Sequence, residues 1–205
     1  MKKWVLTPDK YLKPEEAAVL RSYLEDKALA AIAKKKKKPV RDWAMIDIAL
    51  SAGLRASEIT NLTVQDAHLG KGESALFVKN GKGKKDRLVL IGDKLKRHLK
   101  DHLSWKKSAG EPTTPTSYLF ASERGPKMTL SALQKRFKHW TRAAGLPSRY
   151  SIHSARHTYG TMLYRNTKDL RMVQKQLGHS SCQVTEVYAD VLSEDTEKAV
   201  NALYA

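Results

Sequence analysis

The sequence has almost no cysteine and no long apolar run. Cys182 is the single cysteine among 205 residues, so no internal disulfide can form and a reducing, intracellular setting is expected. No apolar run approaches the roughly 20 residues that span a bilayer, so no membrane partner is expected. The N-terminus, MKKWVLTPDK, lacks the apolar core of a signal peptide. These absences argue against a disulfide-stapled or membrane-spanning protein and favour a cytoplasmic one.

Acidic residues are also scarce. The chain has 21 Asp and Glu against 38 Lys and Arg, which gives a formal net charge of +17. This excess favours a polyanionic partner, most often nucleic acid, although charge alone also fits a basic protein without one. The acids are scattered, and no Cys/His or carboxylate cluster has metal-ligand spacing, so neither a metal nor another cofactor is expected. With 41% hydrophobic residues, the chain can form a packed core of one good-sized domain or two small ones.

Helical patterns dominate the first two thirds of the chain. A helix is expected to open at Pro14, because proline suits a first turn, and to continue to Ala33. The five lysines of Lys34 to Lys38, followed by Pro39, predict a solvated linker, with a loop lying on DNA backbone as the alternative. Further helices are predicted over 40–50, 93–107, 129–144 and 193–204, and a short strand over 117–121.

A tight turn follows the second of these helices. Gly53 is expected to end the helix, and Ser57 to cap the next one, with Glu58 in its first turn. Arg55 then lies between the two, on a backbone fixed from both sides. The alternative for Arg55 is an ordinary surface arginine at a helix junction.

A β-hairpin is predicted over about residues 75–91. The β-branched, apolar runs ALFVK and RLVLI flank the turn sequence NGKG. The hairpin loop is strongly basic, and so is one side of helix 129–144, for which a simple amphipathic surface helix is the equal alternative. Basic residues of these two segments whose side chains suit contact with phosphates are Lys79, Lys84, Lys85, Arg87, Lys135 and Arg136.

The last third of the chain gathers side chains that can act on one phosphate. His153 and Arg156 are three residues apart, which places them on one face of a helix. His179 follows a glycine that is expected to end the helix LRMVQKQL, and Tyr188 lies nine residues further on. Arginine fits two phosphate oxygens, histidine donates a hydrogen bond or carries a proton, and tyrosine can be a covalent nucleophile. This stretch therefore predicts attack on a phosphodiester.

The spacing of these motifs resembles a known family. HSARHTYGT, QLGHSS and VTEVYADV together resemble the tyrosine recombinases, or phage integrase family, whose pattern is H-x-x-R-H-T, then L-G-H, then a tyrosine. SAGLRASEITNL resembles the family's G-x-R-x-x-E box, and GKGKKDR its G-K-G-x-K-x-R hairpin. The resemblance covers roughly residues 10–190. It implies an α+β, mainly helical catalytic domain with a small antiparallel β-sheet or hairpin.

The resemblance also implies a role for each matching residue. Arg55 and Arg156 would clamp the phosphate, His179 would add a donor, and Glu58 would orient the site. His153 would donate to the phosphate or help take the tyrosine proton. The predicted catalytic residues are Arg55, Lys82, His153, Arg156, His179 and Tyr188.

Two of these residues would handle the bonds that change. Tyr188 would attack the phosphorus and form a 3′-phosphotyrosyl bond, while Lys82 would protonate the leaving 5′ oxygen. Lys84 and Lys85 are the alternatives for Lys82. His157, which directly follows Arg156, is expected to serve helix packing or a backbone hydrogen bond.

The implied function is that of a site-specific recombinase (integrase), which cuts and rejoins double-stranded DNA by metal-free transesterification. The alternatives are a type IB topoisomerase-like relaxation enzyme and a non-cleaving DNA-binding protein. Residues 1–205 are expected to form a single catalytic domain, without the N-terminal core-binding domain that most family members carry. The resemblance implies that the basic residues named above, on the hairpin and on helix 129–144, bind DNA. It also implies that the helix at 193–204 links a homo-oligomer on nucleoid DNA, with packing on its own domain as the equal alternative.

Overall fold

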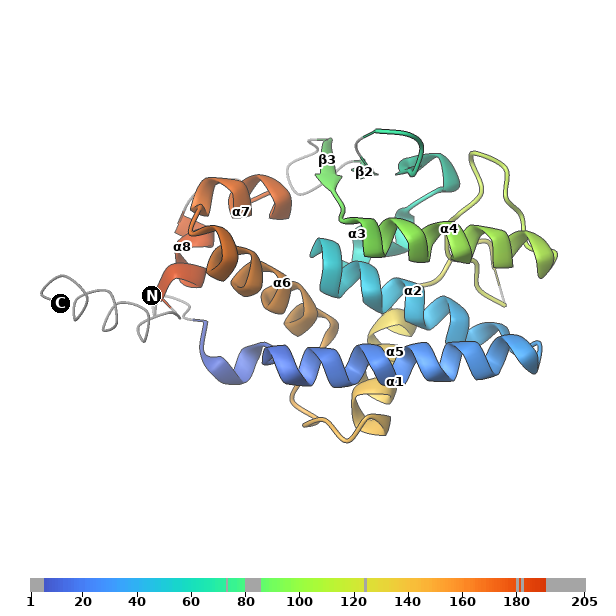
Figure 1. Ribbon diagram of the computed structural model, residues 1–205, viewed down its shortest axis with the longest axis horizontal. Helices are drawn as coiled ribbons and strands as arrows, with labels where there is room; N and C mark the ends of the chain where they lie inside the picture. Colours follow the sequence, from blue (N-terminus) through green and yellow to red (C-terminus); the bar gives the residue numbers. More distant parts are fainter. Residues whose placement is uncertain are drawn as a thin grey trace, which may run out of the picture.

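The protein is described from a computed structural model that covers residues 6–72, 74–79, 86–123, 125–179, 181 and 183–190. Helices form most of it, and one three-stranded antiparallel sheet lies against them, so the predicted α+β, mainly helical fold is confirmed (Figure 1). Within these ranges no helix is long and apolar enough to cross a membrane.

The first two helices form an antiparallel pair. Helix α1 spans Pro14–Ala33, as predicted, and α2 spans Lys37–Ala52. The predicted linker is too long, because α2 already begins at Lys37 and only residues 34–36 connect the helices. Pro39 lies in the first turn of α2, where a helix does not need the N–H that proline lacks, so it starts this helix instead of stopping one.

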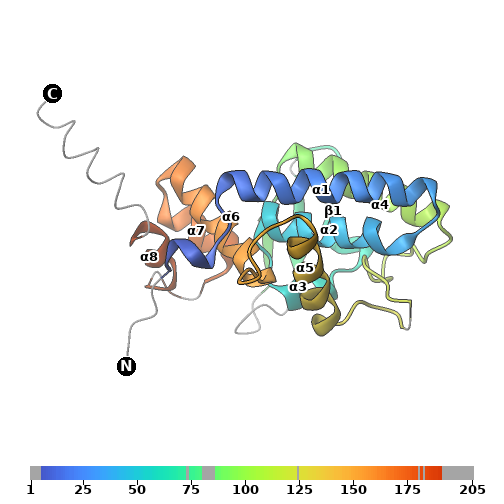
Figure 2. The ribbon, with the colours of Figure 1, turned by 90° about the horizontal axis from the view of Figure 1, so that it is seen from below.

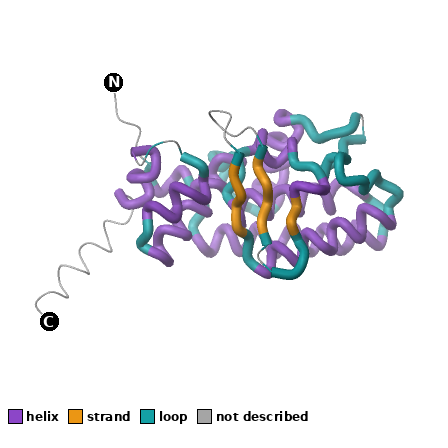
Figure 3. Tube along the Cα trace, turned by 90° about the horizontal axis from the view of Figure 1, so that it is seen from above, coloured by secondary structure: helices purple, strands orange, loops and turns teal. Residues whose placement is uncertain are grey.

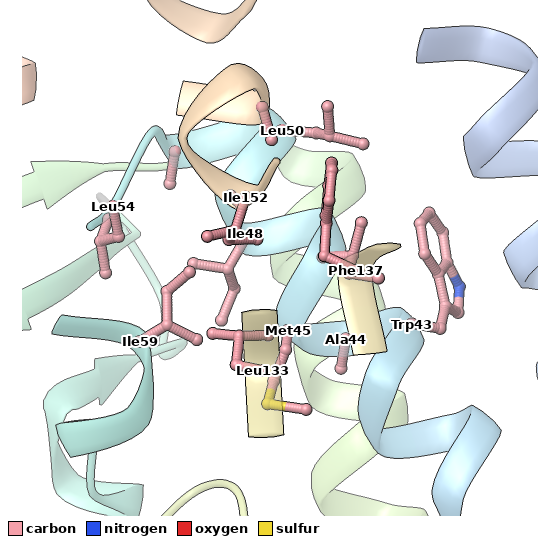
Figure 4. Close-up of a cluster of buried hydrophobic side chains, with 14 of the residues drawn as sticks. Trp43, Ala44, Met45, Ile48, Leu50, Leu54, Ile59, Leu133, Phe137 and Ile152 are labelled. Carbon is pink, nitrogen blue, oxygen red and sulfur yellow. The ribbon is translucent and has the colours of Figure 1, made fainter. Parts of the chain in front are cut away.

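Helix α2 is the centre of the core. Every residue from Val40 to Leu50 is buried, and the helices α1, α4 (Asp93–Ser108), α5 (Leu130–Ala143) and α6 (Ile152–Thr167) pack around it. In the close-up, Met45 and Ile48 of α2 lie against Leu133 and Phe137 of α5 (Figure 4). Seen from below, α5 crosses α1 and α2 (Figure 2). The core therefore fixes the end of α2, where the candidate site begins.

The sheet has the order β1-β2-β3 and is antiparallel throughout (Figure 3). Strands β2 (Ala75–Val78) and β3 (Arg87–Leu90) confirm the hairpin, and Val78 pairs with Arg87 at the end where the loop connects the strands. Strand β1 (Ala67–His68) was not predicted, because two residues carry no pattern. The strand predicted over 117–121 is wrong: Tyr118 forms only an isolated bridge with Thr63.

Three helices at one end of the molecule form a smaller cluster. Helix α6, which also packs on α2, leads into α7 (Leu170–Leu177) and α8 (Gln183–Asp190), and α7 and α8 lie at one end of the molecule in Figure 1. The buried apolar residues of this cluster are Leu6, Val173, Leu177, Val187 and Tyr188. The helix predicted over 193–204 lies outside the described residues.

Candidate active site

The junction between α2 and α3 (Ala56–Asn61) positions Arg55. Gly53 ends α2 with φ +62°, and a Cβ there would lie 2.4 Å from Cδ1 of Tyr159, so glycine is required by conformation and by space. The predicted cap at Ser57 is wrong, because Arg55 itself is the N-cap residue of α3. Glu58, the third residue of α3, supplies the acidic half of a capping box: its Oε2 accepts the Arg55 backbone N–H at 2.8 Å.

The Glu58 carboxylate holds two guanidinium groups. Nη1 of Arg55 donates to Oε1 at 2.8 Å, and Nη1 and Nη2 of Arg87 donate to the two carboxylate oxygens at 2.9 Å each. Burial alone would raise the pKa of Glu58, but the charge and hydrogen bonds of Arg87 and Arg55 outweigh burial and lower it to about 2. Glu58 is therefore an anion that orients both arginines, as the sequence predicted for Arg55.

Arg87, the first residue of β3, belongs to this cluster. The sequence predicted a DNA contact, but its side chain is only 14% exposed and both of its Nη atoms face Glu58. A Cβ on Gly178 would lie 2.6 Å from Nε of Arg87, so the glycine before His179 also makes room for this guanidinium. The family-like hairpin motif identified Arg87, but spacing alone did not show which way it points.

Arg156 is the most deeply buried cation of the site. It lies on α6 and is 4% exposed, with Nη1 donating to the Gly53 carbonyl at 2.6 Å and Nη2 to the Leu177 carbonyl at 2.7 Å. Burial first, and then the neighbouring Arg55, lower the pKa of Arg156 to about 10, which leaves it charged at neutral pH. Arg156 thus joins the ends of α2 and α7 through charged hydrogen bonds.

His153 and Arg156 do not share an environment, although they were predicted to share a helix face. His153 is exposed, whereas Arg156 points inward. Three residues rotate an α-helix by about 300°, so the two side chains diverge by about 60° and fall on either side of the boundary between solvent and interior. Partial desolvation of the ring, with Arg156 and Arg55 nearby, lowers the pKa of His153.

The glycine stop of α7 is confirmed, and it presents His179 to the site. Gly178 has φ +64° and its carbonyl accepts from Nη2 of Arg55 at 3.4 Å. The Nδ1 atom of His179 lies 3.0 Å from Oγ1 of the buried Thr185. Burial, followed by the charges of Arg156 and Arg55, lowers the pKa of His179 to about 3, so the ring is neutral near pH 7.

Tyr188 is almost completely buried, with 1% of its surface exposed. A Cβ on Gly160 would lie 2.7 Å from its ring, and the ring stacks on His179 with centroids 6.2 Å apart and planes inclined by 8°. Burial raises the pKa of Tyr188 to about 12, against the opposing effect of the charges of Arg156 and Arg55. The hydroxyl is therefore protonated at neutral pH and lies in the field of two guanidinium groups.

His157 is a member of the site that was not predicted from the sequence. His157 was expected to serve helix packing or a backbone hydrogen bond, but its Nδ1 lies 3.2 Å from the Tyr188 hydroxyl. It lies one helical turn after His153, and the two rings are 5.8 Å apart. That spacing of four residues was the available signal.

Some predicted residues lie elsewhere or outside the description. Lys79 forms a 2.6 Å ion pair with Asp66, and Arg136 donates from Nε to Asp42 at 2.6 Å, so both have internal partners in addition to any DNA contact. Lys135 is exposed on α5. The predicted hairpin-loop residues Lys82, Lys84 and Lys85 lie outside the described residues.

The assembled site has a clear excess of positive charge. Arg55 and Arg87 donate to the carboxylate of Glu58, whereas Arg156 donates to two backbone carbonyls. The charges of Arg55 and Arg156 also act on the Tyr188 hydroxyl, although burial raises its pKa overall. Among the described residues, no group of three or more His, Cys, Asp or Glu side chains could hold a metal ion. What the arrangement can do chemically is bind an anionic group beside a hydroxyl nucleophile.

Solved structures define the class to which this fold belongs. The crystal structure of the XerA recombinase matches 95% of this chain and 65% of its own with a TM-score of 0.76 and 26% identity. That of the XerH site-specific recombinase, bound to palindromic difH substrate in a post-cleavage complex, matches 95% of this chain and 53% of its own, with a TM-score of 0.76 and 25% identity. The fold is that of a recombinase catalytic domain.

Sequence comparisons then give the family. The model of the phage integrase family matches residues 23–195, and the chain belongs to that family. Tyrosine recombinase XerD of Oceanobacillus iheyensis is 36% identical over 156 residues, which are 76% of this chain and 52% of that protein. Tyrosine recombinase XerC of Proteus mirabilis is 33% identical over 165 residues, 80% of this chain and 52% of that protein. The chain spans about half the length of these relatives.

Proposed function

We propose that this domain cuts and rejoins double-stranded DNA as a site-specific recombinase, through a 3′-phosphotyrosyl intermediate on Tyr188. The observation that carries the proposal is the buried tyrosine hydroxyl in the field of Arg55 and Arg156, in a chain that belongs to the phage integrase family. The relative XerH, whose structure holds its difH substrate after cleavage, supports DNA as the substrate class.

The arginines would stabilise the charge that builds up on the phosphate. A phosphodiester gains negative charge as a nucleophile attacks, so fixed donors lower the barrier. Arg55 and Arg156 would each offer donors to the non-bridging oxygens, and His153 and His179 would add hydrogen bonds. Glu58 orients Arg55 and Arg87 before DNA arrives, so these two guanidinium groups are already positioned when the phosphate binds. These cations would take the place of a metal ion.

The reaction would proceed in two balanced transesterifications. The Tyr188 oxygen forms a bond to phosphorus and loses its proton, while the bond to the 5′ oxygen breaks and that oxygen gains a proton from Lys82. The phosphodiester energy is kept in the phosphotyrosyl bond. A second 5′ hydroxyl then attacks phosphorus and gives its proton back to Lys82. The bond from phosphorus to the Tyr188 oxygen breaks, that oxygen regains its proton and the strand is resealed, so no ATP is consumed. Homo-oligomerisation through residues 193–204 on DNA stays a prediction, as does the single-domain organisation of 1–205.

A nicked suicide substrate tests this proposal, because its short 5′ fragment diffuses away and traps the covalent intermediate. We expect a DNA–protein adduct on a denaturing gel, in the presence of EDTA, for the wild-type chain and none for Tyr188→Phe. Candidate sites come from a random pool. Exchanged ends between two duplexes would distinguish recombination from the relaxation of one plasmid by a topoisomerase. Tight binding without an adduct on any DNA would instead support a non-cleaving DNA-binding protein.

A further inference from the structure

The proposed reaction requires a group to take the proton from Tyr188, and one side chain of the site already contacts it. The Nδ1 atom of His157 lies 3.2 Å from the Tyr188 hydroxyl oxygen, and the two ring centroids are 6.1 Å apart. His153 on the same helix is exposed instead, with its ring 5.8 Å from that of His157. Geometry therefore favours the inner histidine of α6 as the partner of the nucleophile.

Charged and titratable groups face His157 from several elements. They are His153 and Arg156 on α6, Lys10 on the turn Pro8–Lys10, His179 after α7 and Tyr188 on α8. Burial first, and then the charges of His153 and Arg156, lower the pKa of His157 to about 4. The ring is neutral near pH 7, so one of its two nitrogens carries a lone pair that can accept a hydrogen bond.

We propose that His157 is the catalytic residue that accepts the Tyr188 proton during strand cleavage and returns it during rejoining. This inference rests on the proposed function. In the tautomer with hydrogen on Nε2, the Nδ1 lone pair accepts the Tyr188 O–H. As the tyrosine oxygen bonds to phosphorus, its O–H bond breaks and the proton moves to Nδ1, which forms an imidazolium. When a 5′ hydroxyl later attacks, the departing tyrosine oxygen takes this proton back.

Bound DNA would assist the transfer. In the free protein, the cations Arg156 and Lys10 disfavour a second positive charge on His157. A phosphate held by Arg55 and Arg156 brings negative charge that offsets these cations, so the imidazolium becomes easier to form when substrate is present. Because Arg156 and Lys10 still disfavour its positive charge, the imidazolium of His157 readily donates its proton once the phosphotyrosyl bond is attacked. His157 would therefore act only in the DNA complex.

The first experiment separates proton removal from leaving-group protonation. Adduct formation is measured on a suicide substrate with the normal 5′ oxygen and on one with a 5′-bridging sulfur, whose thiolate leaves without a proton. The His157→Asn variant keeps a polar atom near Nδ1 but cannot take a proton. It should lower the rate by about 10²–10⁴-fold on both substrates, and less at high pH. The rate of adduct formation by Lys82→Ala should be restored on the sulfur substrate. The matched control is His68→Asn, which makes the same substitution at an exposed histidine on β1.

The inference would be overturned if His157→Asn formed the adduct at a rate within threefold of the wild type. It would also be overturned if the sulfur substrate restored the rate of His157→Asn as fully as it restores that of Lys82→Ala. A wild-type chain that forms no adduct on either substrate would instead contradict the proposed function itself, and the inference with it. A second measurement uses the native chain, so it does not depend on how the variant folds. Nitrogen-15 NMR at pH 7 should show the Nε2–H tautomer for His157, with a resonance that moves in Tyr188→Phe. A proton on Nδ1 would overturn the inference.

Discussion

The core around α2 and the cluster of α6, α7 and α8 are both buried, but different interactions stabilise them. Around α2 the contacts are between apolar side chains such as Ile48, Met45 and Phe137 (Figure 4). In the second region, Arg156 donates to two backbone carbonyls and Tyr188 stacks on His179. Apolar contacts do not change with pH, whereas buried charges and imidazoles do. Around α2 such groups, among them Asp42 and Asp47, are the minority, but in the second region they form the site. The first region supports the site and the second carries its chemistry.

The largest effect on stability is expected in the α2 core. Phe137 is fully buried, so Phe137→Ala removes apolar contacts and leaves a cavity. We expect the free energy of unfolding, measured by urea titration, to fall by about 3–5 kcal/mol. The rate of adduct formation per folded molecule should stay close to that of the wild type. A tenfold lower rate at equal folded fraction would show that the core also shapes the chemistry.

Arg156→Lys should show the opposite pattern. Lysine keeps the charge, but its ammonium group lacks the planar, forked set of donors of arginine. It therefore cannot bind the Gly53 and Leu177 carbonyls and also present two donors to a phosphate. The rate of adduct formation should fall by about 10²–10³-fold. The loss of stability should be about 1–3 kcal/mol, because one buried carbonyl loses its donor. The rates of adduct formation are compared at saturating DNA. If the variant were as fast as the wild type, Arg156 would have no role in the proposed reaction.

Glu58 connects the two regions, and its effect should depend on pH. Its pKa in the folded chain, about 2, lies below the ordinary value of 4.5, so its contribution is complete above pH 4.5 and is lost as the pH falls toward 2. The shift corresponds to about 3 kcal/mol, which Glu58→Gln should remove at pH 7. Unfolding curves of the two chains should converge between pH 4.5 and 2. A difference that stays constant over this range would contradict the assignment.

Gly160→Ala tests how closely Tyr188 packs on α6. A Cβ at 160 would meet the Tyr188 ring at 2.7 Å, so α8 must shift, at a cost of about 1–3 kcal/mol. Adduct formation should fall together with stability. Gly70→Ala is the matched control, because a Cβ there meets nothing within 4 Å. Equal behaviour of the two variants would show that the tyrosine is not held as described.

The smallest stability effect is expected for Lys135, whose exposed side chain can be compared with its neighbour. Lys135→Gln should change the free energy of unfolding by less than about 0.5 kcal/mol, yet reduce the salt dependence of DNA binding by about one phosphate contact. Arg136→Gln should instead destabilise the fold, because Asp42, which is fully buried, loses a donor. Binding titrations at several salt concentrations give both slopes. Unchanged slopes would argue against a DNA contact on α5.

Much of the fold could be predicted from local patterns, whereas the candidate site residues came from the family resemblance. Gly53 and Gly178 end helices at the predicted positions. The motifs that resemble the family pointed to Arg55, Arg156, His179 and Tyr188, whose catalytic roles stay predictions. The direction of side chains could not be predicted. Arg87 turns from the hairpin to Glu58, and His157 turns inward to Tyr188, because the packing of α6 against α8 and of α7 against β3 decides both.

Errors at helix starts have a related cause. Arg55 was not expected as an N-cap residue, because arginine is not a preferred cap, yet Glu58 satisfies the backbone N–H from the third position. Pro39 was read as a stop, but a helix accepts proline in its first turn, so α2 begins at Lys37. In both cases the boundary follows from which residues the first turn of a helix accepts.

The central claim is that Tyr188 is the residue that joins DNA. The most direct measurement is to trap the adduct, digest the protein and identify by mass spectrometry the residue that carries the nucleotide. We predict a 3′-phosphotyrosyl nucleotide on Tyr188, in the peptide that contains α8. A nucleotide on Tyr159, Tyr164 or any other residue would contradict the account.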